Sequence, residues 1–142
     1  ARKMVKAGAG RIVWTSSVAG LVKVPFDGAY AASQHAEEGI CSAMREELAP
    51  YGVQVVTINP GAFRTGFNDT GMESMDQWWS QGERVVEHWP VRELNRQHDP
   101  AEMISAMVEV IEAENPPYRT VRPAAAEEMA RREQAEAWDL KV

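Results

Sequence analysis

Two short apolar runs without regular polar alternation constrain the fold of this chain most strongly. They span residues 11–15 ("RIVWT") and residues 53–58 ("VQVVTI"). Runs of this kind are typical of strands buried on both faces of a parallel sheet. Residues 29–48 between them are predicted to form a long helix, the kind of crossover that two parallel strands require. A third, shorter strand is predicted near Arg119 to Val121.

The rest of the chain is predicted to continue this alternation of helices and strands. The opening "ARKMVKAGAG" is typical of a helix end capped by Gly8 or Gly10. A further helix is predicted to begin at Asp99, residues 124–138 are predicted to form a terminal helix, and residues 62–98 form a polar excursion with one or two short helices. The order of elements predicts an α/β fold with a parallel sheet and helices on both faces.

Charge and cysteine content exclude several classes of function. The 142-residue chain carries a formal net charge of −6, which argues against non-specific binding to nucleic acid or to an anionic membrane. Cys41 is the sole cysteine, and His35, His88 and His98 lack the spacing of a zinc site, so no metal site is expected. The sequence has no apolar run near the roughly 20 residues of a membrane span, and no N-terminal leader is expected. We expect a cytoplasmic protein.

The helix predicted at residues 29–48 carries a row of apolar and small side chains. We expect this row to pack mainly on the sheet. We also expect Cys41 to be buried as a small apolar residue. The row comprises Ala32, Ala36, Ile40, Ala43, Met44 and Leu48.

Polar residues follow the predicted strands at the edge where ligands bind in open α/β sheets, beyond the carboxyl ends of the strands. Ser17 follows the first strand, and Pro60 and Gly61, with Thr65 shortly after, follow the second. Tyr30 opens the helix that joins these strands. The topology therefore predicts that Ser17, Tyr30 and Thr65 come to one rim of the sheet.

Tyr30 and Gln34 lie four residues apart and hence on one side of the helix. A tyrosine acts as a general acid or base only if its pKa, ordinarily about 10, is brought toward the working pH. A cation one helical turn away is the economical way to do so. A serine hydroxyl nearby can then share the substrate oxygen with the phenol.

These residues together resemble the catalytic half of the short-chain dehydrogenases/reductases. The family pattern is a serine, then tyrosine-x-x-x-lysine, then proline-glycine with a threonine four residues past the glycine. The chain has Ser17, "YAASQ" thirteen residues further on, and "NPGAFRT" after the next strand. The resemblance covers about residues 1–122. It implies a Rossmann-like doubly wound parallel sheet, of which the chain holds the C-terminal portion with about three strands.

The resemblance also implies roles for individual residues. Tyr30 would be the proton donor and acceptor at a carbonyl or secondary alcohol, and Ser17 would orient that oxygen. Gln34 stands at the lysine position and would contact the cofactor ribose. The cofactor would be NAD or NADP, and the substrate a small carbonyl or alcohol. The residues expected to contact the cofactor are Tyr30, Gln34, Pro60, Gly61, Phe63 through its backbone, and Thr65.

The chain departs from the family pattern at Gln34. An amide donates a hydrogen bond, but it cannot stabilise a phenolate by charge. Two unit charges about 4 Å apart interact by roughly 4 kcal/mol at an effective dielectric constant of about 20, so weak activity or none is expected. Lys23 and Arg64 are candidate substitute cations.

The second departure is the absence of the glycine-rich nucleotide loop after a first strand. "GAGRIV" precedes a strand, so it is not interpreted as a phosphate cradle. We expect residues 1–123 to be the C-terminal half of a Rossmann-type dehydrogenase domain and residues 124–142 a helical tail. The missing strands would come from a longer chain, from a partner or from a homo-oligomer. The resemblance also implies that the helix at residues 29–48 forms a dimer interface, in addition to its packing on the sheet.

Other interpretations of the sequence stay open. A catalytically impaired family member would serve as a scaffold or partner subunit, and a lyase or dehalogenase lineage would use the same serine and tyrosine without nicotinamide. Trp78, Trp79 and Trp89 would either form a lid over an apolar substrate or pack in the excursion.

Overall fold

The computed structural model describes the backbone of residues 1–81 and 97–141. It contains two compact units. The first joins Ala1–Gly61 to Glu102–Val142, and the second is Ala62–Ala101. None of the helices in the described part of the chain is long and apolar enough to cross a membrane.

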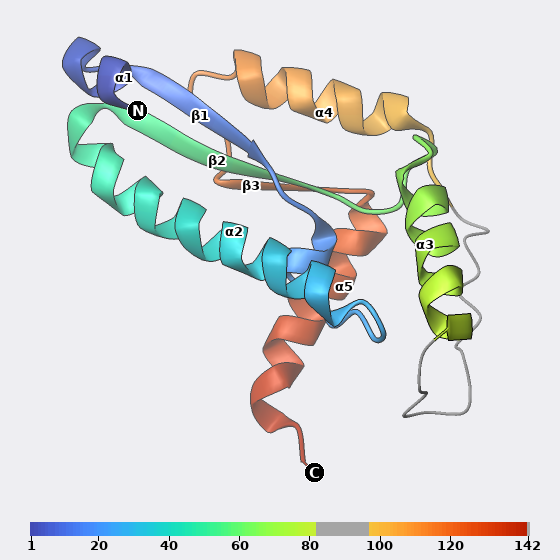
Figure 1. Ribbon diagram of the computed structural model, residues 1–142. Helices are drawn as coiled ribbons and strands as arrows, with labels where there is room; N and C mark the ends of the chain where they lie inside the picture. Colours follow the sequence, from blue (N-terminus) through green and yellow to red (C-terminus); the bar gives the residue numbers. More distant parts are fainter. Residues whose placement is uncertain (82–96, 142) are drawn as a thin grey trace. The chain divides into compact units, whose positions relative to one another are not determined.

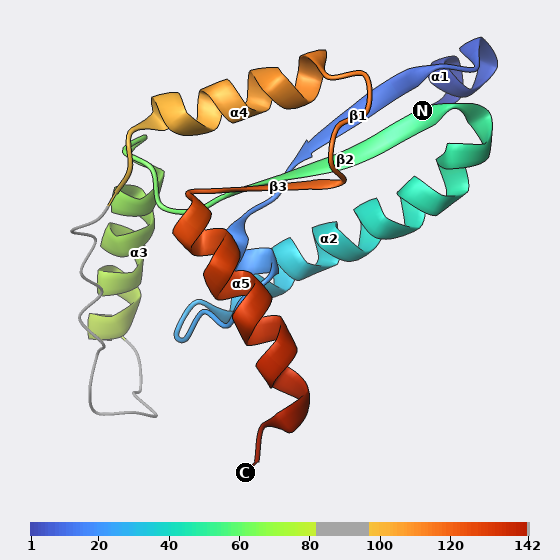
Figure 2. The same ribbon diagram turned by 180° about the vertical axis from the view of Figure 1, so that it is seen from behind.

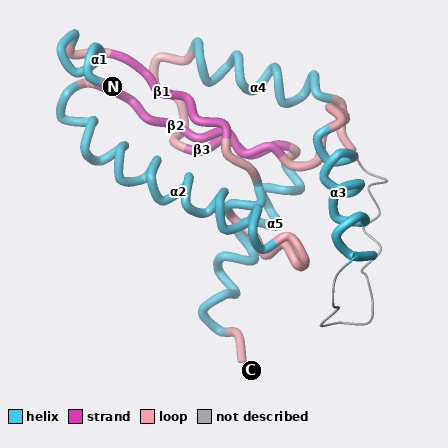
Figure 3. The backbone as a smooth tube through the Cα atoms, viewed as in Figure 1, coloured by secondary structure: helices cyan, strands magenta, loops and turns pink. Residues whose placement is uncertain are grey.

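The first unit contains a parallel sheet of three strands, as predicted. The strands β1 (Gly10–Thr15), β2 (Val53–Pro60) and β3 (Arg119–Arg122) lie in the order β1-β2-β3 (Figures 1 and 3). β1 pairs with β2 from Gly10↔Val53 onward, and β2 pairs with β3 from Thr57↔Arg119 onward. The α/β fold and the parallel sheet are therefore confirmed.

The two apolar runs differ in burial. β2 lies between two neighbours, and Val53, Val55 and Ile58 are each at most 2% exposed. In β1, the residues from Gly10 to Trp14 are only half-buried. The expectation that β1 is buried like β2 was wrong, because among the described strands β1 has a neighbour on one side alone.

Helices cover both faces of the sheet (Figures 1 and 2). The helices α2 (Gly28–Leu48) and α5 (Ala124–Glu136) lie on one face, and α4 (Pro100–Glu112) lies on the other. At the chain start, α1 (Arg2–Ala7) ends at Gly8, whose φ of 66° gives the predicted left-handed cap. α5 packs through Ala130 on Leu21, Val22 and Val121.

Only two of the six residues in the apolar row of α2 are even half-buried, so the row faces the sheet less than expected. Ile40 is 50% exposed, and Ala32 and Ala36 are exposed as well. The buried residues of this helix are Glu38 and Cys41. The row failed as a guide because the face toward β2 holds a paired carboxylate and a small thiol in place of large apolar side chains.

Arg11 of β1 connects the C-terminal end of α4 to the sheet by hydrogen bonds. Its guanidinium donates hydrogen bonds to the carbonyl oxygens of Val110, Ile111, Ala113 and Glu114, at distances of 2.5–3.1 Å. Its Nε donates to Gln54 Oε1 at 2.8 Å. The last carbonyls of a helix lack partners within the helix, so an arginine of β1 supplies the cap of α4.

The second unit contains α3 (Phe67–Gln81), in the excursion predicted to hold short helices. Phe63 is buried and forms a parallel bridge with His98, and the two rings make an edge contact with centroids 6.0 Å apart. Asp99 Oδ1 accepts a hydrogen bond from the Ala101 N–H at 2.9 Å. This bond confirms Asp99 as the cap of α4.

Candidate active site

Ser17 lies in the loop that follows β1. It begins the 3₁₀ turn Val18–Gly20, and its Oγ accepts a hydrogen bond from the Ala19 N–H at 3.1 Å. Its carbonyl oxygen accepts from the Gly20 N–H, also at 3.1 Å. The residue is buried, and so is Ser16, whose Oγ has no hydrogen-bond partner among the described residues. The turn therefore fixes the backbone of Ser17 at the carboxyl end of the sheet.

Tyr30 and Gln34 lie in the first turns of α2, as the sequence predicted. Both are half-buried. The Tyr30 carbonyl accepts a hydrogen bond from Ser33 Oγ at 2.7 Å, and Gln34 Nε2 lies 3.5 Å from the same hydroxyl. The amide of Gln34 is thus held by a neutral group of its own helix.

Gly20 brings the loop of Ser17 against the helix of Tyr30. A Cβ atom at Gly20 would lie 2.9 Å from the carbonyl oxygen of Gln34 and 3.1 Å from Cγ of Glu38. The distance to the carbonyl oxygen is shorter than real Cβ atoms show, so glycine allows this close approach of the backbones. The structure therefore joins the Ser17 loop and the Gln34 turn, two of the predicted site segments.

Pro60 and Gly61 end β2, where the sequence predicted a strand stop. Both are half-buried. The Gly61 N–H donates to the carbonyl oxygen of Arg122 at 2.7 Å, and a Cβ at Gly61 would lie 3.1 Å from Cδ of Pro123. This close approach holds the end of β2 beside the end of β3.

Phe63 and Thr65 belong to the second compact unit. The Thr65 N–H donates to the Phe63 carbonyl at 2.8 Å, and Thr65 Oγ1 accepts from the Phe67 N–H at 3.5 Å. Arg64, named above as a candidate cation, pairs with Asp99 at 3.8 Å. The predicted roles of Phe63 and Thr65 stay predictions.

The structure does not test whether the three tryptophans of the excursion form a lid over a substrate or pack there. The side chains of Trp78 and Trp79, and the whole of Trp89, lie outside the described residues. The lid and the packing alternatives therefore both stay open.

A group of buried polar side chains lies next to the predicted site, and the sequence analysis missed it. Asn59 and Thr57 are fully buried in β2, and Glu38 is 7% exposed in α2. The sequence signal was present, because two polar residues besides Gln54 interrupt the apolar run of β2, and one of them directly precedes Pro60. A buried asparagine in a central strand requires partners.

Burial and carboxylates also act on two groups near Glu38. Burial raises the pKa of the Cys41 thiol to about 11, with smaller contributions from the charges of Glu38 and Glu37. Burial likewise raises the pKa of Tyr118, and Glu38 adds to the effect while Arg119 opposes it. Neither group would be ionised near neutral pH.

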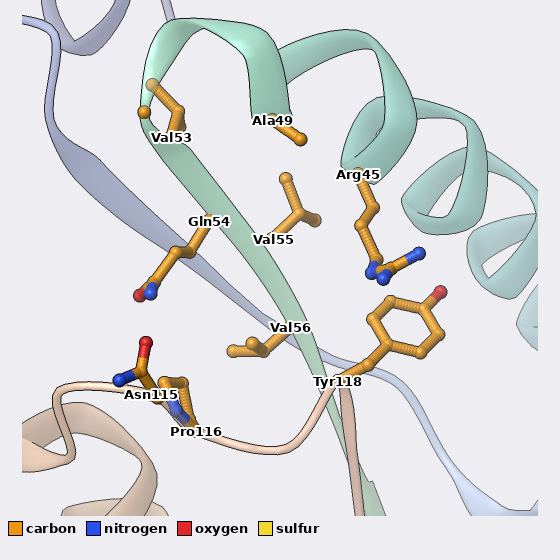
Figure 4. Close-up of a pocket in the computed structure, with 10 residues that line it drawn as sticks. Arg45, Ala49, Val53, Gln54, Val55, Val56, Asn115, Pro116 and Tyr118 are labelled. Carbon is orange, nitrogen blue, oxygen red and sulfur yellow. The ribbon is translucent and has the colours of Figure 1, made fainter.

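A pocket lies elsewhere in the first unit. It has a volume of about 370 Å³, and Figure 4 shows Arg45 and Tyr118 side by side on its wall. The guanidinium carbon of Arg45 lies 5.3 Å from the centre of the Tyr118 ring. Val53 and Gln54 line it from the beginning of β2, whereas ligands in open α/β sheets bind beyond the carboxyl ends of the strands. This pocket therefore lies at the end of β2 opposite to Pro60.

The described residues contain no group of three or more histidine, cysteine, aspartate or glutamate side chains that would hold a metal ion. The donors near Ser17 and Tyr30 are hydroxyl and amide groups, which suit hydrogen bonding to an organic ligand.

Comparison with known proteins identifies the family. Residues 1–76, more than half of the chain, match the family described as short chain dehydrogenase. This chain belongs to that family. A protein of Bacteroides thetaiotaomicron named 3-ketodihydrosphingosine reductase is 33% identical over 125 residues, which cover 82% of this chain and 45% of that protein.

Solved structures of short-chain dehydrogenases share the fold of the chain. One from Streptomyces avermitilis gives a TM-score of 0.71 at 23% identity, and one from Burkholderia cenocepacia in complex with NADP gives 0.63 at 21%. Each comparison covers 97% of this chain and 50% of the other. The Rossmann-like sheet is thereby confirmed. The chain spans about half the length of these relatives.

Proposed function

We propose that the protein containing this chain is an oxidoreductase that transfers hydride between NAD or NADP and a carbonyl or secondary alcohol. The observation that carries the proposal is the contact at Gly20, which packs the loop of Ser17 on the turn of α2 that follows Tyr30. Membership of the short-chain dehydrogenase family supports it further.

In this proposal Tyr30 and Ser17 act on the same substrate oxygen. During reduction the Tyr30 phenol gives its proton to the oxygen while the carbonyl carbon is reduced, and in the reverse direction it takes that proton back. The Ser17 hydroxyl donates a hydrogen bond to the oxygen and shares its developing charge. Bound nicotinamide would supply or accept the hydride.

The neutral polar groups of the chain fit the nicotinamide half of the cofactor. Gln34 Nε2 can donate to a ribose hydroxyl, and Pro60 and Gly61 are partly exposed at the end of β2, where a ligand can contact them. The Phe63 backbone and the Thr65 hydroxyl complete the proposed contacts. One structural relative was solved with NADP. The proposal leaves NAD and NADP as alternatives for this chain.

Gln34 is expected to lower the rate of the proposed reaction. Its amide bears no charge, so it cannot stabilise the phenolate that forms when Tyr30 gives up its proton. Loss of even about 1.4 kcal/mol of transition-state stabilisation slows a reaction tenfold. We therefore expect turnover with Gln34 to be slow, with proton transfer as the impaired step.

Steady-state kinetics of four proteins test this proposal. Wild type, Gln34→Lys, Gln34→Met and Tyr30→Phe are compared in the longest natural polypeptide that contains the sequence, with NADH and NADPH. The ketone panel includes 3-ketodihydrosphingosine, because one relative is named for its reduction. Gln34→Met keeps the length of the side chain without its amide donor, so it separates ribose contact from charge.

We expect Gln34→Lys to raise kcat at least tenfold and Tyr30→Phe to abolish turnover. Gln34→Met is expected to weaken cofactor binding about fivefold, the effect of one hydrogen bond of about 1 kcal/mol. Turnover of wild type equal to Gln34→Lys would refute the role of charge. If neither protein turns over any ketone or binds either cofactor, the non-catalytic scaffold is the better reading.

A further inference from the structure

A fully buried amide connects the end of β2 to the loop of Ser17. Asn59 Nδ2 donates to Glu38 Oε1 at 2.5 Å and to the carbonyl oxygen of Ser17 at 3.1 Å. Asn59 Oδ1 accepts from Thr57 Oγ1 at 3.1 Å. Two N–H donors and one acceptor are thus all engaged. Because the amide is 0% exposed, water cannot replace any of these partners.

Glu38 determines which way this amide points. Its Oε1 faces Asn59, and its Oε2 accepts from Arg119 Nη2 at 2.6 Å. A buried carboxylate requires donors at its oxygens. Reversal of the amide would place Asn59 Oδ1 against the carboxylate, so the N–H donors must face Glu38 and Ser17. The charge of Glu38 on α2 therefore determines that Asn59 donates a hydrogen bond to the Ser17 carbonyl oxygen.

Glu38 also lies on the helix of the proposed site. It follows Tyr30 by eight residues and Gln34 by four, which places the three along one side of α2. The carbonyl oxygen of Ser17 accepts from the Gly20 N–H as well as from Asn59, and Gly20 packs against Glu38 Cγ. The carbonyl of Ser17 is consequently tied to its own turn and, through Asn59, to α2.

We propose that Glu38 and Asn59 are positioning residues that fix Ser17 relative to the helix of Tyr30. The inference rests on the proposed function, because that function makes the Ser17–Tyr30 arrangement matter. Neither residue touches the substrate. Both act through the Ser17 carbonyl, and a misplacement of about 1 Å in such a site can cost on the order of a hundredfold in rate.

A pair of substitutions separates positioning from mere stability. Asn59→Asp puts a carboxylate against Glu38 and against the Ser17 carbonyl. Adding Glu38→Gln restores the first contact, because the new amide donates to Asp at 59 and its oxygen still accepts from Arg119. The double variant thus keeps α2, β2 and β3 joined while the Ser17 carbonyl faces a repelling oxygen. Glu46→Gln, an exposed change on the same helix, is the control.

Amide hydrogen exchange of the Gly20 N–H reports on Ser17 without any need for activity. In the double variant we expect a cooperative thermal transition, but Gly20 exchange at least tenfold faster, with exchange of Ala106 on α4 unchanged. Gly20 exchange at the wild-type rate in the double variant would overturn the proposal. If the Asn59 variants do not fold, Glu38→Asp withdraws the carboxylate from Asn59, and unchanged Gly20 exchange there has the same meaning.

Kinetics then separate this inference from the proposed function. In the Gln34→Lys background, we expect the double variant to lower kcat at least tenfold with KM within twofold. Faster Gly20 exchange with an unchanged kcat would refute the positioning role. Faster exchange with no turnover in any variant would refute the proposed function, while the control of Ser17 by Glu38 and Asn59 would stand.

Discussion

Among single residues, Arg11 makes a dense set of contacts, with five hydrogen bonds from one guanidinium to α4, the turn after it and Gln54. Arg11→Met keeps the apolar stem and removes the donors. We expect the free energy of unfolding to fall by about 2–4 kcal/mol, since a hydrogen bond from a charged donor contributes about 1.5–3 kcal/mol and these share one group. Urea denaturation measures the loss. Arg132→Met, at an exposed position of α5, is the control, and equal losses in the two variants would refute the capping role.

Cys41 is a single residue that makes the stability of the folded protein depend on pH. Its pKa is raised from the ordinary 9.0 of a thiol to about 11 in the folded protein, because burial and then the charges of Glu38 and Glu37 oppose the thiolate. Below about pH 9 the thiol is protonated in both the folded and the unfolded state, so it does not make the free energy of unfolding depend on pH. As the pH rises from about 9 to about 11, the unfolded chain loses its proton first, so the folded state loses stability. Cys41→Ala removes this contribution, and parallel stability–pH curves for the two proteins would contradict it.

The residues of the site could be predicted only in part. Ser17, Tyr30 and Gln34 were predicted from the order of the strands and from the resemblance to the family motif, and the structure places them in the expected elements. Their roles stay predictions. Glu38 and Asn59 were missed because their importance depends on a contact between residues 21 positions apart. A sequence pattern along one helix does not show which face meets a buried strand.

Among the elements, the contact between the 3₁₀ turn and α2 depends on Gly20. Gly20→Ala would place Cβ 2.9 Å from the Gln34 carbonyl oxygen. We expect a loss of about 1–3 kcal/mol in the free energy of unfolding, as for other overpacked sites. Gly39→Ala on α2 is the matched control. No atom lies within 4 Å of its new Cβ, so we expect a gain of about 0.5–1 kcal/mol there. Equal effects at both positions would mean that the turn does not pack as described.

The positions of strands and helices along the chain were predicted better than which of their faces are buried. Each predicted strand and long helix has its counterpart within two residues, because apolar runs and caps are local signals. The inward face of α2 was mispredicted, since Ile40 faces solvent while Glu38 is buried and paired with Arg119. Burial of a charge depends on its partner on another strand, which no local pattern contains. The division into residues 1–123 and a tail stays a prediction.

For the whole molecule, the exposed apolar row on α4 favours association. Ile104, Val108 and Ile111 are 46–59% exposed on one side of the helix, and among the described strands β1 has one unpaired edge. For the 142-residue chain expressed by itself, we expect sedimentation equilibrium at about 100 µM to give a mass above 15.8 kDa. Ile104→Lys with Ile111→Lys should lower it. Glu109→Lys lies outside the exposed row and changes the net charge by the same amount. This control should leave the measured mass unchanged. A single 15.8 kDa species for wild type would refute the expectation.

The cap on α4 also implies an order of events during synthesis. Arg11 precedes the carbonyls it contacts by 99–103 residues. A ribosome that adds about 5–20 residues per second needs on the order of 5–20 s to make that length. β1 and β2 can pair much earlier, since Gly10 and Val53 are 53 − 10 = 43 residues apart. We therefore expect the sheet to begin on the nascent chain with the Arg11 guanidinium still in water, and α4 to be fixed among the last elements.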